Sequence, residues 1–310
     1  NAIIQGETKV ALKHLKDVVK QDTDHIDAYL QIGNILREEG NIKAAIKIHR
    51  SLTVRPNLSR GAYRQIHKSL ALDHYKNGNL NKAKEEALKV VKTNKRNLWA
   101  NQFLLEISEN LNDWKEAAQL SKTVQRIKSS KNPDQLSKFL VFQSMDKLKN
   151  NQSNEAIALL KKAIKNSPTF SMPYKKLGDV LYQENKLQDA IVNWEKFVEL
   201  NPGESKKTLS KIESAYFDIG QFDDVEKFYN RVIQKNPSNL IALVNLANLL
   251  YQKGEYDASM SLIDDAILQN NESIFINLMK LKLSLKQSDE LENKKLIDKI
   301  IEQFKEKNIS

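Results

Sequence analysis

Cysteine is absent from the 310 residues, and glycine and proline are scarce, with nine and six copies. Without cysteine these residues hold no disulfide, no thiolate zinc site and no cysteine nucleophile. No run of about eighteen apolar residues occurs, so the sequence contains no transmembrane helix of ordinary length. With 40% hydrophobic residues the chain can still bury a large core, which excludes a disordered or collagen-like protein.

Sequence motifs that carry catalysis are missing as well. There is no G-x-S-x-G nucleophile elbow, no glycine-rich phosphate loop with a lysine, and no H-E-x-x-H helix. His67 and His74 stand seven residues apart on one helical face, but no other set of metal ligands flanks them, which disfavours a metal site. The sequence therefore predicts a non-enzymatic protein with no catalytic residue, no bound metal and no cofactor.

Positive charge is concentrated in one stretch of the chain. The formal net charge is +10, and residues 51–100 hold eleven Lys and Arg against three Asp and Glu, a local excess of +8. Such a cluster is explained by a solvated basic face, or by contact with an anionic membrane, an acidic partner or nucleic acid. The basic patch that we predict comprises Arg55, Arg60, Arg64, Lys68, Lys89, Lys92, Lys95 and Arg96.

A repeat of about 34 residues organises the whole sequence. Small residues mark it at positions 11, 45, 83, 117, 156, 190, 225 and 259, and five positions before each of them stands Gly or Asn. These two residues accept a left-handed backbone most readily, as a tight turn between two helices requires. We therefore predict turns at Gly6, Gly40, Gly78, Asn112, Asn151, Asn185, Gly220 and Gly254.

Each repeat has the pattern of two amphipathic helices. In residues 172–202, apolar residues recur at three-, four- and seven-residue steps on both sides of the turn. Gly33 and Gly178 occupy a first-helix position where a small residue lets the second helix approach closely. Prolines such as Pro202 then stop the second helix. The pattern predicts an all-α fold of stacked helix hairpins.

These landmarks resemble the tetratricopeptide repeat, in which an aromatic, Leu-Gly, Tyr, Ala, an aromatic, Ala and Pro follow one another along a unit of about 34 residues. The resemblance covers nearly the whole chain. It implies a right-handed superhelical solenoid of about eight tetratricopeptide helix hairpins plus a C-terminal capping helix pair. We divide a single array over residues 1–310 into units at 1–25 (partial), 26–59, 64–97, 98–131, 137–170, 171–204, 206–239 and 240–273, with the cap at 274–308.

Two places depart from the period. About four extra residues occur around 55–60 and about five around 129–135, and we expect both to form longer surface loops. Gly6 already holds the turn position of the first unit, which would then lack most of its first helix. We therefore expect the array to continue upstream of Asn1, in keeping with a sequence that does not begin with Met.

His49 stands where the helical period of residues 41–52 requires an apolar residue. The same slot of other units holds Trp194, Tyr229 and Ile263. We therefore interpret His49 as a packed core residue with one hydrogen bond satisfied, rather than as a catalyst or a metal ligand.

A stacked array offers a long concave groove lined by its first helices, and there we expect a protein or peptide partner to bind. Tyr75, Tyr182, Phe217 and Tyr251 hold one slot in four units, which indicates either an aromatic-lined groove or a residue that the repeat itself packs. The groove residues that we predict are Asn34, Arg37, Lys68, Tyr75, Lys175, Asp179, Tyr182, Ser214, Phe217, Asn245, Asn248 and Tyr251.

A narrower resemblance lies in residues 32–59, 70–85 and 112–120. Above all, the run AIKIHRSL with the following RPNLS is similar to the cytoplasmic repeats of the lipopolysaccharide assembly protein B family. In that family a membrane helix precedes the repeats and a four-cysteine metal domain follows them, and the protein brings a lipid A-committing deacetylase to a membrane protease. The resemblance implies a regulator of lipopolysaccharide biosynthesis at the cytoplasmic face of the bacterial inner membrane, although these residues contain no cysteine for the metal domain. The anionic membrane surface would then lie near the basic patch.

Two other functions are left open by the sequence. One is a generic tetratricopeptide adaptor for a cytosolic peptide, and the other is a repeat protein that binds nucleic acid through its basic patch. Nucleic acid is the less favoured partner, because only Tyr63 and Trp99 near the patch are not already assigned to packing or to the groove. The pattern sets no oligomeric state.

Overall fold

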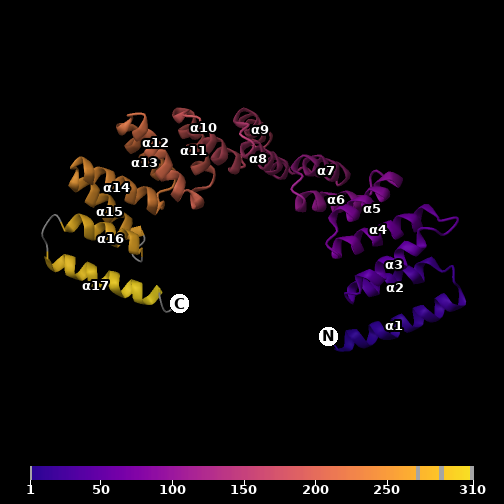
Figure 1. The fold of residues 1–310 in the computed structure, drawn as a ribbon. Helices are drawn as coiled ribbons and strands as arrows, with labels where there is room; N and C mark the ends of the chain where they lie inside the picture. The colour runs from indigo at the N-terminus through magenta and orange to yellow at the C-terminus, as the bar shows by residue number, and fades with distance from the viewer. Residues whose placement is uncertain (1, 270–272, 286–289, 308–310) are drawn as a thin grey trace. The chain divides into compact units, whose positions relative to one another are not determined.

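The computed structural model describes residues 2–269, 273–285 and 290–307, and these ranges contain helices and connecting segments without a strand (Figure 1). The chain divides into two compact units, Asn1–Asn150 and Asn151–Ser310. The predicted all-α class is confirmed, whereas one array over the full length stays a prediction. No helix in the described ranges is long and apolar enough to cross a bilayer.

Unit 1 contains a leading helix, three complete hairpins and the first helix of a fourth. Its helices are α1 (Ala2–Gln21), α2 (Ile26–Glu38), α3 (Ile42–Leu52), α4 (Arg60–Lys76), α5 (Leu80–Thr93), α6 (Leu98–Asn110), α7 (Trp114–Ile127) and α8 (Pro133–Lys149).

Unit 2 begins with the second helix of the repeat whose first helix is α8, and four complete hairpins follow it. Its helices are α9 (Ser153–Asn166), α10 (Met172–Gln183), α11 (Leu187–Leu200), the short 3-10 helix η1 (Pro202–Glu204), α12 (Lys206–Asp218), α13 (Phe222–Lys235), α14 (Leu240–Lys253), α15 (Tyr256–Gln269), α16 (Ile274–Ser284) and α17 (Glu290–Lys307).

The two sets of landmarks have distinct structural roles. Seven small landmark residues lie at the centre of their hairpins with no exposed surface: Ala45, Ala83, Ala117, Ala156, Ala190, Val225 and Ser259. Seven of the eight predicted turns adopt a positive φ, between 56° and 87°: Gly40, Gly78, Asn112, Asn151, Asn185, Gly220 and Gly254. A left-handed residue reverses the chain within about three residues, so the two helices of a hairpin that lies within one unit run antiparallel.

The eighth predicted turn, at Gly6, is wrong. Residues 2–21 form the single helix α1, which passes through Gly6 without a break. Glycine weakens a helix by only about 1 kcal/mol, so the helix-forming residues on both sides override it. The expected half-hairpin at 1–25 is therefore one continuous helix.

The two insertions lengthen helices more than they lengthen loops. The first helices α4 and α8 have 17 residues each, against 12 to 14 in α2, α6, α10, α12 and α14. Residues 53–59 do form a longer loop, but residues 128–132 match the length of the segment 167–171. Side-chain caps from Ser59 and Asn132 start α4 and α8 about one turn earlier than the period alone predicts.

Close approach within a hairpin depends on a glycine opposite a large side chain. A methyl group on Gly33 would lie 2.3 Å from the His49 ring, and one on Gly178 would lie 2.4 Å from the Trp194 ring. Both contacts are impossibly short for a real side chain, so the predicted role of these glycines is confirmed.

The hairpins stack in chain order within each unit. Where both helices of a hairpin lie in one unit, the second helix packs on the first helix of its own hairpin, as α3 does on α2 and α13 on α12; α3 and α13 also pack on the next first helices, α4 and α14. Successive first helices also touch, α2 against α4 and α14 against α16. We call the surface formed by the first helices of a unit its first-helix face, which is built from α2, α4, α6 and α8 in unit 1 and from α10, α12, α14 and α16 in unit 2.

Candidate partner-binding surface

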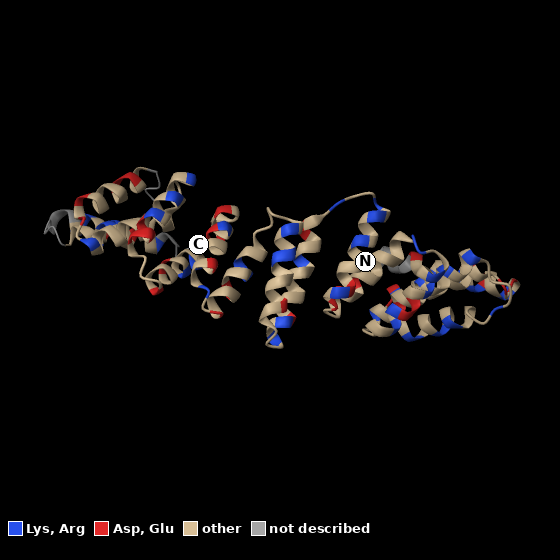
Figure 2. Ribbon diagram, turned by 90° about the horizontal axis from the view of Figure 1, so that it is seen from above, with Lys and Arg blue, Asp and Glu red and all other residues tan. Residues whose placement is uncertain are grey.

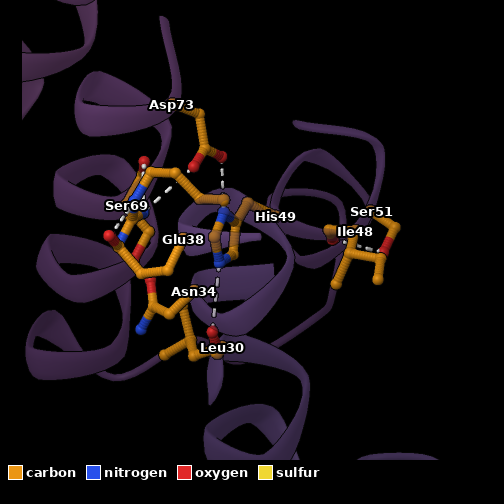
Figure 3. Close-up of polar contacts among 9 residues, drawn as sticks. Leu30, Asn34, Glu38, Ile48, His49, Ser51, Ser69 and Asp73 are labelled. Carbon is orange, nitrogen blue, oxygen red and sulfur yellow. Dashed lines mark hydrogen bonds and ion pairs between the residues drawn. The ribbon is translucent and has the colours of Figure 1, made fainter. Parts of the chain in front are cut away.

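His49 is part of the core of unit 1. Its side chain has no exposed surface, and both ring nitrogens face oxygen acceptors (Figure 3). Nδ1 lies 2.6 Å from Oδ2 of Asp73 on α4, and Nε2 lies 3.2 Å from the carbonyl oxygen of Leu30 on α2. A histidine beside an aspartate can serve as a catalytic base, but here Nε2 is sealed against the backbone and no substrate can reach it. The core interpretation is confirmed, with two hydrogen bonds instead of one.

Arg37 belongs to the same buried cluster and not to an accessible groove. Its guanidinium donates to Oδ1 of Asp73 at 3.0 Å, and only 9% of the residue is exposed. The sequence placed Arg37 on the concave surface, and that placement is wrong. A buried carboxylate on the neighbouring helix, with His49 on its other oxygen, draws the guanidinium inward.

The remaining histidines have separate surroundings. His67 is buried, its Nδ1 lies 2.5 Å from Oε2 of Glu86, and its ring packs on Tyr63. His74 is also buried, and burial lowers the pKa of its imidazole. His25 caps α2 by accepting from the backbone N–H of Ala28. Within the described residues, no three His, Asp or Glu side chains converge as a metal site would need.

On the first-helix face of unit 1, the predicted groove residues mostly join neighbouring first helices. Tyr75 of α4 donates its hydroxyl to Glu106 of α6 at 2.5 Å and accepts from Asn110 at 2.9 Å. The Glu106 hydrogen bond raises the pKa of the Tyr75 phenol, which therefore stays a donor. Asn34 accepts from Ser69 of α4, again between successive repeats.

Lys68 completes the predicted set in unit 1. Its ammonium group lies 5.2 Å from the centre of the Trp99 ring, a cation–π contact between α4 and α6. Trp99 in turn stacks on Phe103. These contacts favour the repeat-packing interpretation for this half of the predicted groove.

On the first-helix face of unit 1, Glu106 and Glu109 of α6 line a cavity of about 430 Å³ that extends to Gln135 of α8. The first-helix face of unit 2 is hollowed between α10 and α12. A cavity of about 550 Å³ opens there. Three predicted groove residues, Asp179, Tyr182 and Ser214, lie together in it. Of the other four, the repeat period placed Trp194 in the core and did not single out the remaining three. The cavity is lined by Asp179, Tyr182, Gln183, Trp194, Ser210, Lys211 and Ser214.

Polar contacts fix the walls of this cavity. Asp179 accepts from the Lys211 ammonium at 2.6 Å and from the Trp194 indole N–H at 3.2 Å. Tyr182 donates to Asp218 of α12 at 3.0 Å, and this hydrogen bond raises the pKa of the Tyr182 phenol. The walls are therefore held before any ligand arrives, which lowers the entropy cost of binding.

An aromatic row continues from the cavity along unit 2. Tyr182 is 38% exposed and Phe217 is 37% exposed, and Phe217 contacts the exposed ring of Phe222. Tyr251 holds the same slot one repeat later and contacts Tyr256 in the same way, with ring centres 5.4 Å apart. The common slot thus gives exposed aromatic surface at Tyr182 and Phe217, whereas Tyr251 is half-buried and its ring is covered by Lys282.

The other predicted groove residues of unit 2 contact their neighbours. Lys175 covers the Phe197 ring of α11, at 4.9 Å from its centre. Asn245 donates to the hydroxyl of Tyr229, and Asn248 accepts from Lys282 of α16. Ser210 and Lys211, which the sequence analysis missed, stand 35 residues after Lys175 and Lys176, so the period could have placed them.

The basic patch is partly neutralised. Arg55 binds Asp24 at 2.9 Å and covers the Tyr29 ring, and Lys89 binds Glu86 at 2.9 Å. Lys68 covers Trp99, as described above. In the part of the chain that the structure describes, no ion pair engages the other five members, which are Arg60, Arg64, Lys92, Lys95 and Arg96.

Comparison with known proteins identifies the repeat. Two models described as tetratricopeptide repeat match residues 26–49 and 216–280. Lipopolysaccharide assembly protein B of Escherichia coli strain K12 is 21% identical over 239 residues, which cover 76% of this chain and 61% of the relative. The protein of that name from Haemophilus influenzae is 24% identical over 292 residues, covering 91% of this chain and 73% of the relative. The chain thus spans about three fifths of the length of the Escherichia coli relative.

Solved structures are similar at the level of the fold. The structure of Naa15/Naa10 bound to HypK-THB matches with a TM-score of 0.51 and 13% identity, covering 91% of this chain and 42% of that chain. A crystal structure of MamA matches at a TM-score of 0.38 and 19% identity, over 57% of this chain and 93% of that chain. The chain thus contains tetratricopeptide repeats and is similar to lipopolysaccharide assembly protein B.

Proposed function

We propose that this tetratricopeptide repeat protein is a non-enzymatic scaffold that binds a polypeptide segment of its partner on the first-helix face of unit 2. Tetratricopeptide repeats indicate a protein–protein interaction scaffold in general. The observation that carries the finer proposal is the cavity of about 550 Å³ between α10 and α12, with its rigid aromatic and polar walls.

The chemistry of that cavity suits a peptide. The exposed part of the Tyr182 ring gives an apolar wall for one side chain of the partner, and the buried Trp194 ring supports it from beneath. Gln183, Ser210 and Ser214 carry amide and hydroxyl groups that can donate to or accept from a peptide backbone. The ion pair of Lys211 and Asp179 leaves little net charge in the cavity, so we expect the bound segment to be mostly uncharged at its centre.

The relatives suggest the biological setting. Their name assigns them to lipopolysaccharide assembly, and we propose a related role for this chain. It would act in regulation of lipopolysaccharide biosynthesis, presenting a client enzyme to a protease or to an assembly machinery. We place this activity at the cytoplasmic face of the bacterial inner membrane or in the cytoplasm, with an adaptor for an unrelated cytosolic peptide as the alternative.

Site-specific photo-crosslinking in cells tests the proposal. A photoreactive amino acid replaces Ser214 inside the cavity in the full-length gene product, and a matched variant carries it at Lys161 on the exposed side of α9. We expect the position-214 variant to capture a specific protein that the position-161 variant does not, and a lipopolysaccharide enzyme or membrane protease would support the narrower role. A purely cytosolic partner would support the adaptor alternative, while equal capture at both positions would contradict binding in the cavity.

A further inference from the structure

The two units differ sharply in charge. Residues 1–150 contain 27 Lys and Arg against 16 Asp and Glu, a balance of +11. Residues 151–310 contain 22 against 23, a balance of −1. Figure 2 shows Lys and Arg along the helices of unit 1. The net positive charge of the protein is therefore a property of unit 1, whereas the proposed peptide site lies in unit 2.

Within unit 1 the excess of Lys and Arg over Asp and Glu is concentrated along one edge of the stacked hairpins. The helices of each hairpin run antiparallel, so the loops 53–59, 94–97 and 128–132, which join one hairpin to the next, lie along the edge opposite the tight turns. We call this the loop edge. None of the three loops contains Asp or Glu, whereas the segment 22–25, which precedes α2 at the same edge, holds Asp22 and Asp24, and Asp24 pairs with Arg55. The loop edge and the adjoining helix ends carry Arg60, Arg64, Lys92, Lys95, Arg96, Lys128 and Lys131.

These seven cations have little to neutralise them. All except the half-buried Arg64 are exposed, and no ion pair engages any of the seven within the described residues. Mutual repulsion along the edge therefore favours an anionic surface that neutralises several cations at once.

Two observations distinguish between a membrane surface and single-stranded nucleic acid as the anionic partner of this edge. Val54, in the first loop, is 83% exposed and lies between Arg50 and Arg55 at the end of α3, so an apolar side chain projects from the basic edge. In contrast, the aromatic rings nearby are occupied: Arg55 covers Tyr29, and Trp99 lies between Lys68 and Phe103. Single-stranded nucleic acid needs free aromatic faces for base stacking, and an apolar tip among cations suits the headgroup region of a bilayer.

We infer that the loop edge of unit 1 binds the anionic phospholipid headgroups of a membrane surface, with Val54 inserted among them. This surface is separate from the peptide site and does not depend on it. Binding rests on several weak electrostatic contacts, so it should fall as added salt screens them.

Vesicle flotation of the full chain tests this inference, using vesicles of phosphatidylcholine alone or with about 30% phosphatidylglycerol. The edge variant carries Arg60→Gln, Lys92→Gln, Lys95→Gln, Arg96→Gln and Lys131→Gln. The control removes the same number of positive charges from exposed lysines of unit 2, through Lys161→Gln, Lys162→Gln, Lys165→Gln, Lys186→Gln and Lys207→Gln. A third variant, Val54→Ser, changes no charge. Circular dichroism melting checks that each variant folds as the wild type does.

The wild type should bind the anionic vesicles, should not bind the neutral ones, and should be released by salt. The edge variant should lose affinity by about tenfold or more, the unit 2 control by less than about twofold, and Val54→Ser by about threefold. Equal losses in the edge and control variants would overturn the inference, because net charge alone would then explain binding. So would tighter binding of the wild type to a single-stranded RNA oligonucleotide than to the anionic vesicles in the same buffer.

Discussion

The imidazole of His49 on α3 lies 2.6 Å from the carboxylate of Asp73 on α4, and neither side chain has any exposed surface. The other oxygen of Asp73 accepts from Arg37 of α2 at 3.0 Å. One carboxylate thus joins three helices of two successive hairpins. His49 also contacts the carbonyl oxygen of Leu30 on α2 at 3.2 Å, so its ring links the same helices a second time.

Replacing Asp73 with alanine should destabilise unit 1 by about 3 to 5 kcal/mol, because it leaves Arg37 and His49 buried without their partner. Urea unfolding followed by circular dichroism measures the loss. Asp24→Ala is the matched control, since it removes a carboxylate whose side chain is 93% exposed from its ion pair with Arg55. That variant should change stability by less than about 1 kcal/mol, and equal losses in the two variants would contradict the account.

The two helices of a hairpin approach closely at Gly33 and at Gly178, so adding a single methyl group there should lower the free energy of unfolding. Gly33→Ala and Gly178→Ala should each destabilise their unit by about 1 to 3 kcal/mol, because the new Cβ overlaps the ring of His49 or Trp194. Gly203→Ala is the control, since no atom lies within 4 Å of its added methyl group. Thermal melting of the three variants measures the effect, and a stabilised Gly33→Ala variant would show that the hairpin packs more loosely than described.

Alkaline pH should weaken unit 2. Burial, together with the charge of Glu195 and the hydrogen bond that Tyr216 donates to it at 2.9 Å, raises the pKa of the Tyr216 phenol to about 12. An unfolded chain loses this proton near pH 10, so the folded state loses stability as pH rises from about 10 towards 12. The decline should be shallower in Tyr216→Phe, which has no phenol to ionise. Urea unfolding between about pH 8 and pH 11 checks this, and an unchanged slope would contradict it.

The sequence predicts well the features that depend on local chemistry and on repetition. Asn112, Asn151 and Asn185 adopt a positive φ, as predicted, because asparagine tolerates that conformation and each copy supports the others. Gly6 misled the prediction because the same residue also fits inside a helix. Only five residues precede Gly6 in the sequence, so the apolar pattern of a first helix could not support the predicted turn there.

The placement of the partner surface was less predictable. Arg37 and Tyr182 occupy the same slot in their repeats, yet Arg37 is buried and Tyr182 is exposed. In the first case the buried carboxylate of Asp73, which also contacts His49, accepts from Arg37 and holds it in the core. In the second case Trp194 fills the space opposite Gly178. Repeat position alone does not show which slots are filled by neighbours, because that depends on contacts between repeats.

The measurement that tests the central claim most directly is the affinity of the crosslinked partner for three purified forms of the chain, determined by isothermal titration calorimetry. The first is the wild type, the second carries Tyr182→Ala and Ser214→Arg in the cavity, and the third carries Gln188→Arg at an exposed position of α11 outside this cavity. Binding on the first-helix face of unit 2 predicts a loss of about tenfold or more in the cavity variant and an unchanged affinity in the Gln188 variant. An unchanged affinity in the cavity variant would contradict it.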